Sequence, residues 1–175
     1  MNELTNKVIW LTGASSGIGE ALAYALAKKN ARLILSARRT DELERVKIKC
    51  IGTAQQDIHI VPVDLTESAS LADATSLALK CFGHIDILIN NGGISQRSFV
   101  HETSMEVFRR LMEVNFFGAI SLTKNLIPHF ISRQQGHFVV MSSVAGKFGT
   151  PYRSGYAASK HALHGFFDAV RAEYW

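Results

Sequence analysis

The sequence predicts an α/β protein with a doubly wound parallel sheet, and three observations lead to this prediction. Short apolar runs of strand length alternate with helical patterns along the chain. The segments between successive runs are long enough for right-handed βαβ units. No linker, repeat or low-complexity segment interrupts the alternation, so residues 1–175 are predicted to form a single domain. The pattern stops in the helix that follows the fifth strand, and we expect the sheet to be truncated there.

The composition is that of a soluble globular domain, with 47% hydrophobic and 19% charged residues. The net charge is +4, but the 19 Lys and Arg residues are scattered, so we expect neither a nucleic-acid partner nor a membrane-surface patch. Cys50 and Cys81 lie outside any CxxC or Cys/His cluster. We therefore predict no metal site, no disulfide framework and a reduced, cytoplasmic location.

The N-terminal residues do not read as a secretory signal, because Met1–Lys7 is polar and the apolar run Val8–Leu11 is short. The longest unbroken apolar stretch, Ala21–Ala27, has seven residues. A membrane-spanning helix needs about 20. We expect no membrane span in this segment.

The first unit is predicted to be a strand, a glycine turn and a helix. Val8–Leu11 is the strand, Thr12–Gly19 the turn and Glu20–Lys29 the helix. Glycines 13, 17 and 19 allow a tight turn and the close approach of a pyrophosphate to the helix N-terminus, where free N–H groups favour anions. The alternative is an ordinary glycine-rich loop, but the strand and helix around it favour nucleotide binding in a Rossmann-like fold.

The second strand, Arg32–Ser36, is followed by Arg38 and Arg39 at the place where such folds read the ribose of the cofactor. An acidic residue there would favour NAD, whereas an arginine pairs with the 2′-phosphate of NADP. The sequence therefore favours NADP, and the alternative is that both arginines are solvated turn residues. Thr40 is expected to cap a helix that runs to about Cys50.

The third strand, Ile58–Val63, ends at Asp64 and Leu65. The Asp64 carboxylate is placed either to accept from an adenine amino group or to cap a helix that begins near Thr66, and the sequence does not separate the two. That helix is expected to stop at Gly83. Its predicted buried face consists of Leu71, Ala74, Leu77 and Ala78.

The fourth strand, Ile85–Ile89, ends in the turn Asn90–Gly93, whose amides either tie strand ends together and admit a ribose or simply form a turn. A long helical pattern follows from Thr103 to about Arg133. Asn115 and Gly118 lie inside it and are poor mid-helix residues, so we expect a kink or a functional task there.

The fifth strand, His137–Met141, leads into Ser143, and the last helix is predicted from Tyr156 onward. Tyr156 and Lys160 are four residues apart, so a helix places them on one face. A neighbouring cation favours a phenolate, so the pair is suited to acid/base work, and the Ser143 hydroxyl can donate to an oxygen that gains negative charge. Such a Tyr/Lys spacing also occurs by chance on many helices, so other motifs must support it.

Five motifs together closely resemble the short-chain dehydrogenase/reductase family in order and spacing, over essentially the whole chain. They are Thr12–Gly19, Asn90–Gly93, Asn115-x-x-Gly118, Ser143 and Tyr156-x-x-x-Lys160. Asn91–Ser98 and Tyr156–Phe167 further resemble the member 7 branch of that family. The family's usual turn reads Asn-Asn-Ala-Gly, and we expect Gly92 in place of the alanine to have little effect.

The resemblance implies a hydride transfer between NADP(H) and a small-molecule carbonyl or alcohol, most simply a lipophilic one. It implies that Tyr156 is the general acid/base, that Lys160 holds the nicotinamide ribose, that Ser143 orients the carbonyl and that Asn115 anchors a proton-relay water. The same resemblance, together with the motifs above, predicts a cofactor site formed by Gly13, Ser15, Ser16, Gly17, Ile18, Gly19, Arg38, Arg39, Asp64, Leu65, Asn91, Gly92, Tyr156 and Lys160.

Members of the family continue into further C-terminal strands and a substrate loop that this sequence lacks. A non-catalytic nucleotide-binding or interaction module is therefore the alternative function. We also predict a homodimer or homotetramer, because the last helix carries a row of small and apolar residues. The row is Ala158, Ala162, Phe166 and Ala169, and the alternative is that it packs on its own sheet.

Overall fold

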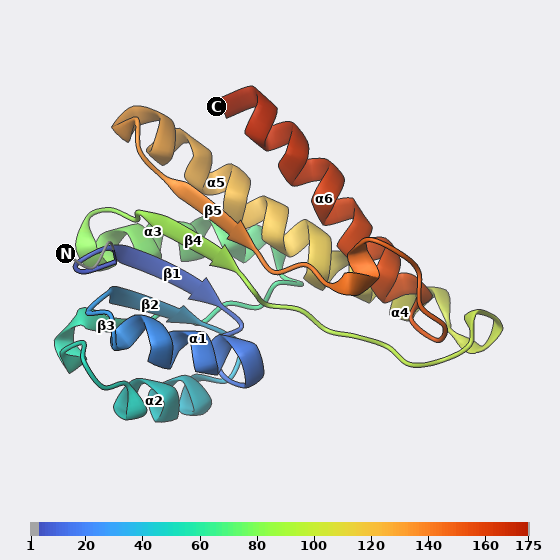
Figure 1. Cartoon of the computed structure of the whole chain (residues 1–175), viewed down its shortest axis with the longest axis horizontal. Helices are drawn as coiled ribbons and strands as arrows, with labels where there is room; N and C mark the ends of the chain where they lie inside the picture. The colour runs from blue at the N-terminus through green and yellow to red at the C-terminus, as the bar shows by residue number, and fades with distance from the viewer. Residues whose placement is uncertain (1–3, 175) are drawn as a thin grey trace.

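The computed structural model describes residues 4–174, which form a five-stranded parallel sheet between two layers of helices (Figure 1). The predicted doubly wound α/β fold is confirmed. The strand order is β3-β2-β1-β4-β5, so the direction of winding reverses between β1 and β4. The strands are β1 (Val8–Thr12), β2 (Arg32–Ser36), β3 (Ile58–Ile60), β4 (Ile87–Asn90) and β5 (His137–Val140).

Helices α1 and α2 cover one face of the sheet, and α3 and α5 cover the other (Figure 1). Helix α6 packs against α4 and against the chain after β5. The helices are α1 (Gly17–Ala27), α2 (Thr40–Lys49), α3 (Leu71–Phe82), α4 (Met105–Met112), α5 (Gly118–Arg133) and α6 (Ser154–Tyr174).

Strand β1 lies at the centre of the sheet and is fully buried, because both of its faces are covered. Its side chains alternate between the layers: Ile9 and Leu11 pack with α1 and α2, whereas Val8 and Trp10 pack with α3 and α5. The indole Nε1 of Trp10 donates to Ser36 Oγ (2.8 Å), so its polar atom is satisfied inside the core.

Strand β3 was predicted to end at Val63, but it ends at Ile60. Pro62 has no N–H to donate to the neighbouring strand. The N–H groups of Val61 and Val63 still donate, to a carbonyl of β2 and to the carbonyl of the residue directly after β2. Strand β4 begins at Ile87 and not at Ile85. Asp86, the residue before β4, binds the start of the neighbouring strand β1 through its side chain, since its Oδ2 accepts from the Val8 N–H (2.9 Å).

Two helix predictions need correction. Thr40 is the first residue of α2 and not its cap, and the cap position belongs to Arg39. Helix α3 begins at Leu71, after a 3₁₀ turn at Ser68–Ser70, and Leu77 is 54% exposed. Leu77 lies six positions after Leu71, which puts it roughly 240° around the helix from Leu71. The other three predicted positions are buried, and Gly83 ends the helix in a left-handed conformation as expected.

The long helical pattern is interrupted, as the polar and small residues inside it indicated. A π-helical turn over Glu113–Phe117 joins α4 to α5. The first helix of this pair starts at Met105, where the Ser104 hydroxyl accepts from the Val107 N–H (3.4 Å). Helix α6 starts at Ser154, two residues before Tyr156.

Strand β5 forms one edge of the sheet, and its side chains are half-buried or exposed. A groove of about 740 Å³ lies beside it, lined by residues of α5, β5 and α6. Within residues 4–174, no helix combines the length and the apolar character needed to cross a membrane.

Candidate active site

A cavity of about 410 Å³ opens at the carboxyl ends of β1, β2 and β4, where the strand order reverses. Nucleotides bind at this place in doubly wound folds. Of the residues predicted to bind the cofactor, those that line the cavity are Gly13, Ser15, Ser16, Ile18, Gly19, Arg38, Arg39, Asp64, Leu65, Asn91 and Gly92. Gly17, Tyr156 and Lys160 do not line it.

The floor of the cavity is a hydrogen-bonded junction between β1 and β4, centred on Thr12. The Thr12 hydroxyl donates to the Ile89 carbonyl (3.3 Å) and accepts from the N–H groups of Asn91 and Gly92 (3.0 Å each). The Asn91 side chain donates to the carbonyls of Thr12 (3.0 Å) and Gly13 (3.3 Å). Of the two predicted tasks of this turn, the structure therefore supports the one that ties strand ends together.

The glycine turn is packed on its inner side and open on its outer side. A Cβ atom on Gly19 would overlap the Gly13 carbonyl oxygen and lie 2.6 Å from Asn91 Nδ2. Gly17 has a positive φ of 58° and nothing within 4 Å of a Cβ position. The turn thus presents open space beside the N-terminus of α1, where an anion is favoured.

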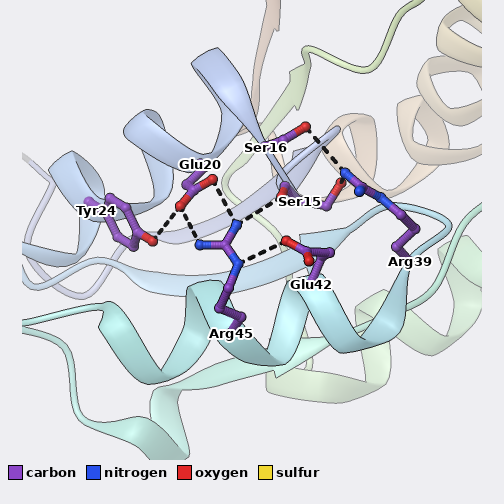
Figure 2. A network of polar contacts seen from close by, with 7 residues as sticks. All are labelled: Ser15, Ser16, Glu20, Tyr24, Arg39, Glu42 and Arg45. Atoms are coloured by element: carbon purple, nitrogen blue, oxygen red, sulfur yellow. Dashed lines mark hydrogen bonds and ion pairs between the residues drawn. The ribbon is translucent and has the colours of Figure 1, made fainter.

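A network of polar side chains holds this turn against α2 (Figure 2). The Arg45 guanidinium pairs with both carboxylate oxygens of Glu20 (2.7 and 2.9 Å), with Glu42 Oε2 (2.8 Å) and with the Ser15 carbonyl (3.3 Å). Tyr24 Oη donates to Glu20 Oε1 (2.7 Å). The hydrogen bonds from Arg45 and Tyr24 lower the pKa of Glu20 to about 2.

This network is expected to make the protein lose stability in acid. The pKa of Glu20 is lower in the folded chain than its ordinary 4.5, so its contribution is present above pH 4.5 and is lost as the pH falls toward 2. In Glu20→Gln, Tm should be lower than in the wild type at pH 6 and should fall less between pH 4.5 and 2. Thermal unfolding across this range measures it. Parallel curves for the two proteins would contradict the assignment.

Arg38 and Arg39, which follow β2, both line the cavity but differ in their polar contacts. Arg39 Nη2 donates to Ser15 Oγ and Ser16 Oγ at 3.4 Å each, across the mouth of the glycine turn (Figure 2). Within residues 4–174, Arg38 makes no hydrogen bond or ion pair, so its guanidinium is available to a ligand. Arg110 of α4 lines the same cavity and adds a third arginine, which was not predicted from the sequence.

Asp64 forms a local turn and caps no helix. Its Oδ1 accepts from the N–H (3.0 Å) and the hydroxyl (2.8 Å) of Thr66. Burial by itself raises the pKa of this carboxyl, but the two bonds from Thr66 and the charges of Arg38 and Arg110 outweigh it and leave the pKa lowered. The residue lines the cavity as a charged acceptor, which fits the predicted contact with adenine.

Gly92 lies close to the side chain of Leu65. A Cβ atom there would lie 2.7 Å from Leu65 Cδ1. Leu65 also packs closely on Gly118, at the start of α5, where a Cβ position would lie 3.2 Å from Leu65 Cδ2 and 2.7 Å from Leu65 Cβ. Alanine at position 92 would require a shift of Leu65 Cδ1, which is the end of a flexible side chain and can move at little cost, so the expectation of a small effect stays a prediction.

Asn115 lies in the π-helical turn, is 1% exposed and uses its side chain fully. Its Oδ1 accepts from the Ile94 N–H (2.8 Å), and its Nδ2 donates to the Ile94 carbonyl (2.9 Å) and to Ser159 Oγ (3.0 Å). The side chain thus joins the loop after β4 to α6. This contact explains the expected interruption of the helix, while the role of anchoring a water stays a prediction.

Lys160 and Tyr156 project from α6 next to the end of β5. Lys160 is 5% exposed, its Nζ donates to the Met141 carbonyl (2.7 Å) and lies 5.8 Å from the centre of the Tyr156 ring. Burial lowers the pKa of the Lys160 ammonium. Ser143 Oγ accepts from the Ala145 N–H (3.1 Å), which leaves the hydroxyl proton free to donate elsewhere.

Several residues that support this site were not identified from the sequence. Gln96 accepts from the Tyr156 N–H through Oε1 (3.1 Å), and Ser159 bridges Asn115 and the Tyr156 carbonyl (2.7 Å). Thr12 directly follows the apolar run Val8–Leu11, and this position at a strand end could have indicated its role. Gln96 and Ser159 carry no local signal, because tertiary packing alone brings them to the site.

A parallel α/β sheet with a nucleotide-sized cavity at its switch point, followed by a helix that carries a Tyr/Lys pair, defines a class of nucleotide-binding dehydrogenases and reductases. A family model described as short chain dehydrogenase matches residues 7–175, and the chain belongs to this family. It is 52% identical over 174 residues to human Dehydrogenase/reductase SDR family member 7, which places it in the member 7 branch. That match covers 98% of this chain and 51% of the human protein, so the chain spans about half the length of this relative.

Solved structures show the same fold. A short-chain dehydrogenase/reductase from Burkholderia phymatum in complex with NAD superimposes with a TM-score of 0.91 and 28% identity, over 99% of this chain and 62% of that one. A variant of actinorhodin polyketide ketoreductase with NADPH superimposes with a TM-score of 0.90 and 26% identity, over 97% and 65%. These two neighbours hold different nicotinamide cofactors.

Proposed function

We propose that this chain is the cofactor-binding and catalytic part of an NADP(H)-dependent oxidoreductase that acts on a lipophilic carbonyl or alcohol. The observation that carries the proposal is the convergence of the candidate catalytic residues. Asn115 and Tyr156 are joined through the Ser159 hydroxyl, and Lys160 binds the Met141 carbonyl just after β5, two residues before Ser143. Membership of a dehydrogenase and reductase family supports it.

The lining of the cavity supports a nicotinamide dinucleotide as the ligand. The cavity is lined by the turn before α1, whose free N–H groups suit a pyrophosphate, and by Arg38, which makes no polar contact among the described residues and suits a 2′-phosphate. Asp64 offers an acceptor at the same end. When bound, the cofactor supplies or accepts the hydride.

The residues of the chain then manage the proton. Tyr156 gives a proton to the carbonyl oxygen during reduction and takes it back during oxidation. The ammonium of Lys160, on the same helical face, stabilises negative charge on the phenol oxygen. The Ser143 hydroxyl, whose oxygen is already held by the Ala145 N–H, donates to the same carbonyl oxygen as charge develops on it.

The surroundings of Ser143 support a lipophilic substrate. Val144 directly after it is 68% exposed, and Phe148 is 57% exposed in the loop that follows. Apolar side chains gathered on the surface near a candidate site favour an apolar ligand.

Loss of absorbance in the NADPH band tests the proposal, with a panel of aldehydes, ketones and quinones as substrates. Turnover of any lipophilic carbonyl supports it. A chain that binds NADPH but turns over none of the panel supports the second candidate, a non-catalytic nucleotide-binding module. The observation that favours this candidate is that Tyr156 and Lys160 do not line the nucleotide cavity. A chain that binds no nicotinamide cofactor would contradict both.

Cofactor preference gives a separate prediction. NADPH should bind more tightly than NADH, because the free Arg38 guanidinium pairs with the 2′-phosphate. A charge-assisted contact of this kind contributes about 1.5–3 kcal/mol, so Arg38→Ala should weaken NADPH binding by roughly 10- to 150-fold. NADH affinity should stay nearly constant. Fluorescence titration of both cofactors measures the difference, and Arg171→Ala, at the far end of α6, is the control.

The assembly is part of the proposal. The row expected to mediate contact between subunits does not pack on its own sheet, since Ala158 and Ala169 are exposed and Ala162 and Phe166 are half-buried. The buried face of α6 is formed by other residues, among them Leu163 and Val170. A homodimer or homotetramer through this row is therefore our proposal, and light scattering of the purified protein tests it. The cytoplasmic location stays a prediction.

A further inference from the structure

The segment Met141–Ser143, which follows β5, is fastened to α6 at two points. Lys160 Nζ donates to the Met141 carbonyl (2.7 Å), and His164 Nε2 is hydrogen-bonded to Ser142 Oγ (2.9 Å). Residues 160 and 164 are four apart, so both side chains project from one face of the helix. They therefore hold two consecutive residues that lead directly into Ser143.

The chain after Ser143 packs closely against the hydrogen bond between Ser142 and His164. A Cβ atom on the buried Gly146 would lie 2.5 Å from Ser142 Oγ and 3.1 Å from His164 Nε2. The Gly146 N–H donates to the Ser143 carbonyl (2.8 Å), which closes the 3₁₀ turn Val144–Gly146. The Ser142 and His164 side chains are half-buried, so this hydrogen bond is partly shielded from water, where such bonds count for more.

The two hydrogen bonds from α6 differ in whether a cofactor competes for the donor. Lys160 is one of the residues proposed to bind the cofactor, so its ammonium divides its donors between Met141 and a ligand. His164 has no task in the proposed reaction, and it does not line the nucleotide cavity. Its bond to Ser142 is thus the fastening that stays in place when Lys160 engages a cofactor.

We propose that His164, acting through Ser142, is a positioning residue that holds Ser143 in register with Tyr156. This inference rests on the proposed function for its catalytic consequence, but the contact itself can be tested without turnover. Loss of the bond should let the segment 141–146 move away from α6. A small displacement of an oxyanion donor lowers the rate without changing how the cofactor binds.

The variants are His164→Ala, Ser142→Ala and the double variant. Loss of one hydrogen bond should lower kcat by about five- to tenfold, while KM for NADPH stays within about twofold of the wild type. The double variant should be no worse than either single one, because both remove the same bond. His164→Gln, whose amide also reaches Ser142, should restore most of the rate. His161→Ala is the matched control, since this exposed histidine of the same helix bonds only the Ala157 carbonyl (2.8 Å) among the described residues.

Hydrogen–deuterium exchange supplies the readout that needs no substrate. In His164→Ala and Ser142→Ala the amides of Ala145 and Gly146, which donate to Ser143, should exchange faster than in the wild type and in His161→Ala. Unchanged exchange in both variants would overturn the inference, as would a rate loss in His164→Ala that Ser142→Ala does not share. A wild type without turnover would instead count against the proposed function, and exchange would still decide on the positioning contact.

Discussion

Tyr156→Phe is expected to lower turnover by about 10²–10⁴-fold, the usual contribution of a general acid/base. The variant keeps the ring, which lies 5.8 Å from Lys160 Nζ, and removes only the hydroxyl. NADPH affinity and Tm should therefore stay close to those of the wild type. Measuring kcat/KM together with cofactor binding separates a lost proton donor from a damaged site.

Tyr152→Phe is the matched control for this experiment. Tyr152 is exposed, packs on Phe99 and has no role in the proposed proton transfer. Its hydroxyl should be dispensable. Near wild-type turnover in Tyr156→Phe would show that the mechanism is wrong, whatever the control does.

Gly19→Ala is expected to have the largest effect on the folded state. Its Cβ would overlap the Gly13 carbonyl oxygen, which belongs to the backbone and has no rotamer to change, and would press on Asn91 Nδ2. Overpacking of a tight site typically costs about 1–3 kcal/mol and occasionally more, and this case lies at the upper end. Tm should fall by several degrees, and cofactor binding should be lost with the shape of the turn.

Gly17→Ala in the same turn is the control, because nothing lies within 4 Å of its Cβ position. Its positive φ of 58° alone should cost about 1–2 kcal/mol. Thermal unfolding and NADPH titration of both variants test the difference. An effect at Gly19 no larger than that at Gly17 would contradict the contact with Gly13 as the main constraint on position 19.

The sequence was a good guide to the fold where an element is defined by its own residues. Strand β2 has the predicted bounds, and β1 differs by one residue, because both are continuous apolar runs buried on two faces. The ends of β3 and β4 were misplaced, since the extent of a ladder depends on the neighbouring strand. Leu77 was misassigned because its angular position on the helix outweighs its hydrophobicity.

The site divides in a similar way. Gly19, Tyr156 and Lys160 could be identified because their chemistry depends on spacing along the chain. Arg110 and His164 could not, because only tertiary packing brings them to the cavity and to the end of β5. Groups that act within one element can thus be predicted from the sequence, whereas groups that act between elements cannot.

The junction around Thr12 has a consequence for how a ligand is received. One hydroxyl bonds the backbone of the residues at the end of β4 in three places, so the two central strands cannot separate without breaking all of these bonds together. The floor of the cavity is thus preorganised, and adjustment is confined to side chains on its rim, such as Arg38 and Leu65. Binding then costs little backbone entropy, and differences in affinity between cofactors come from the rim.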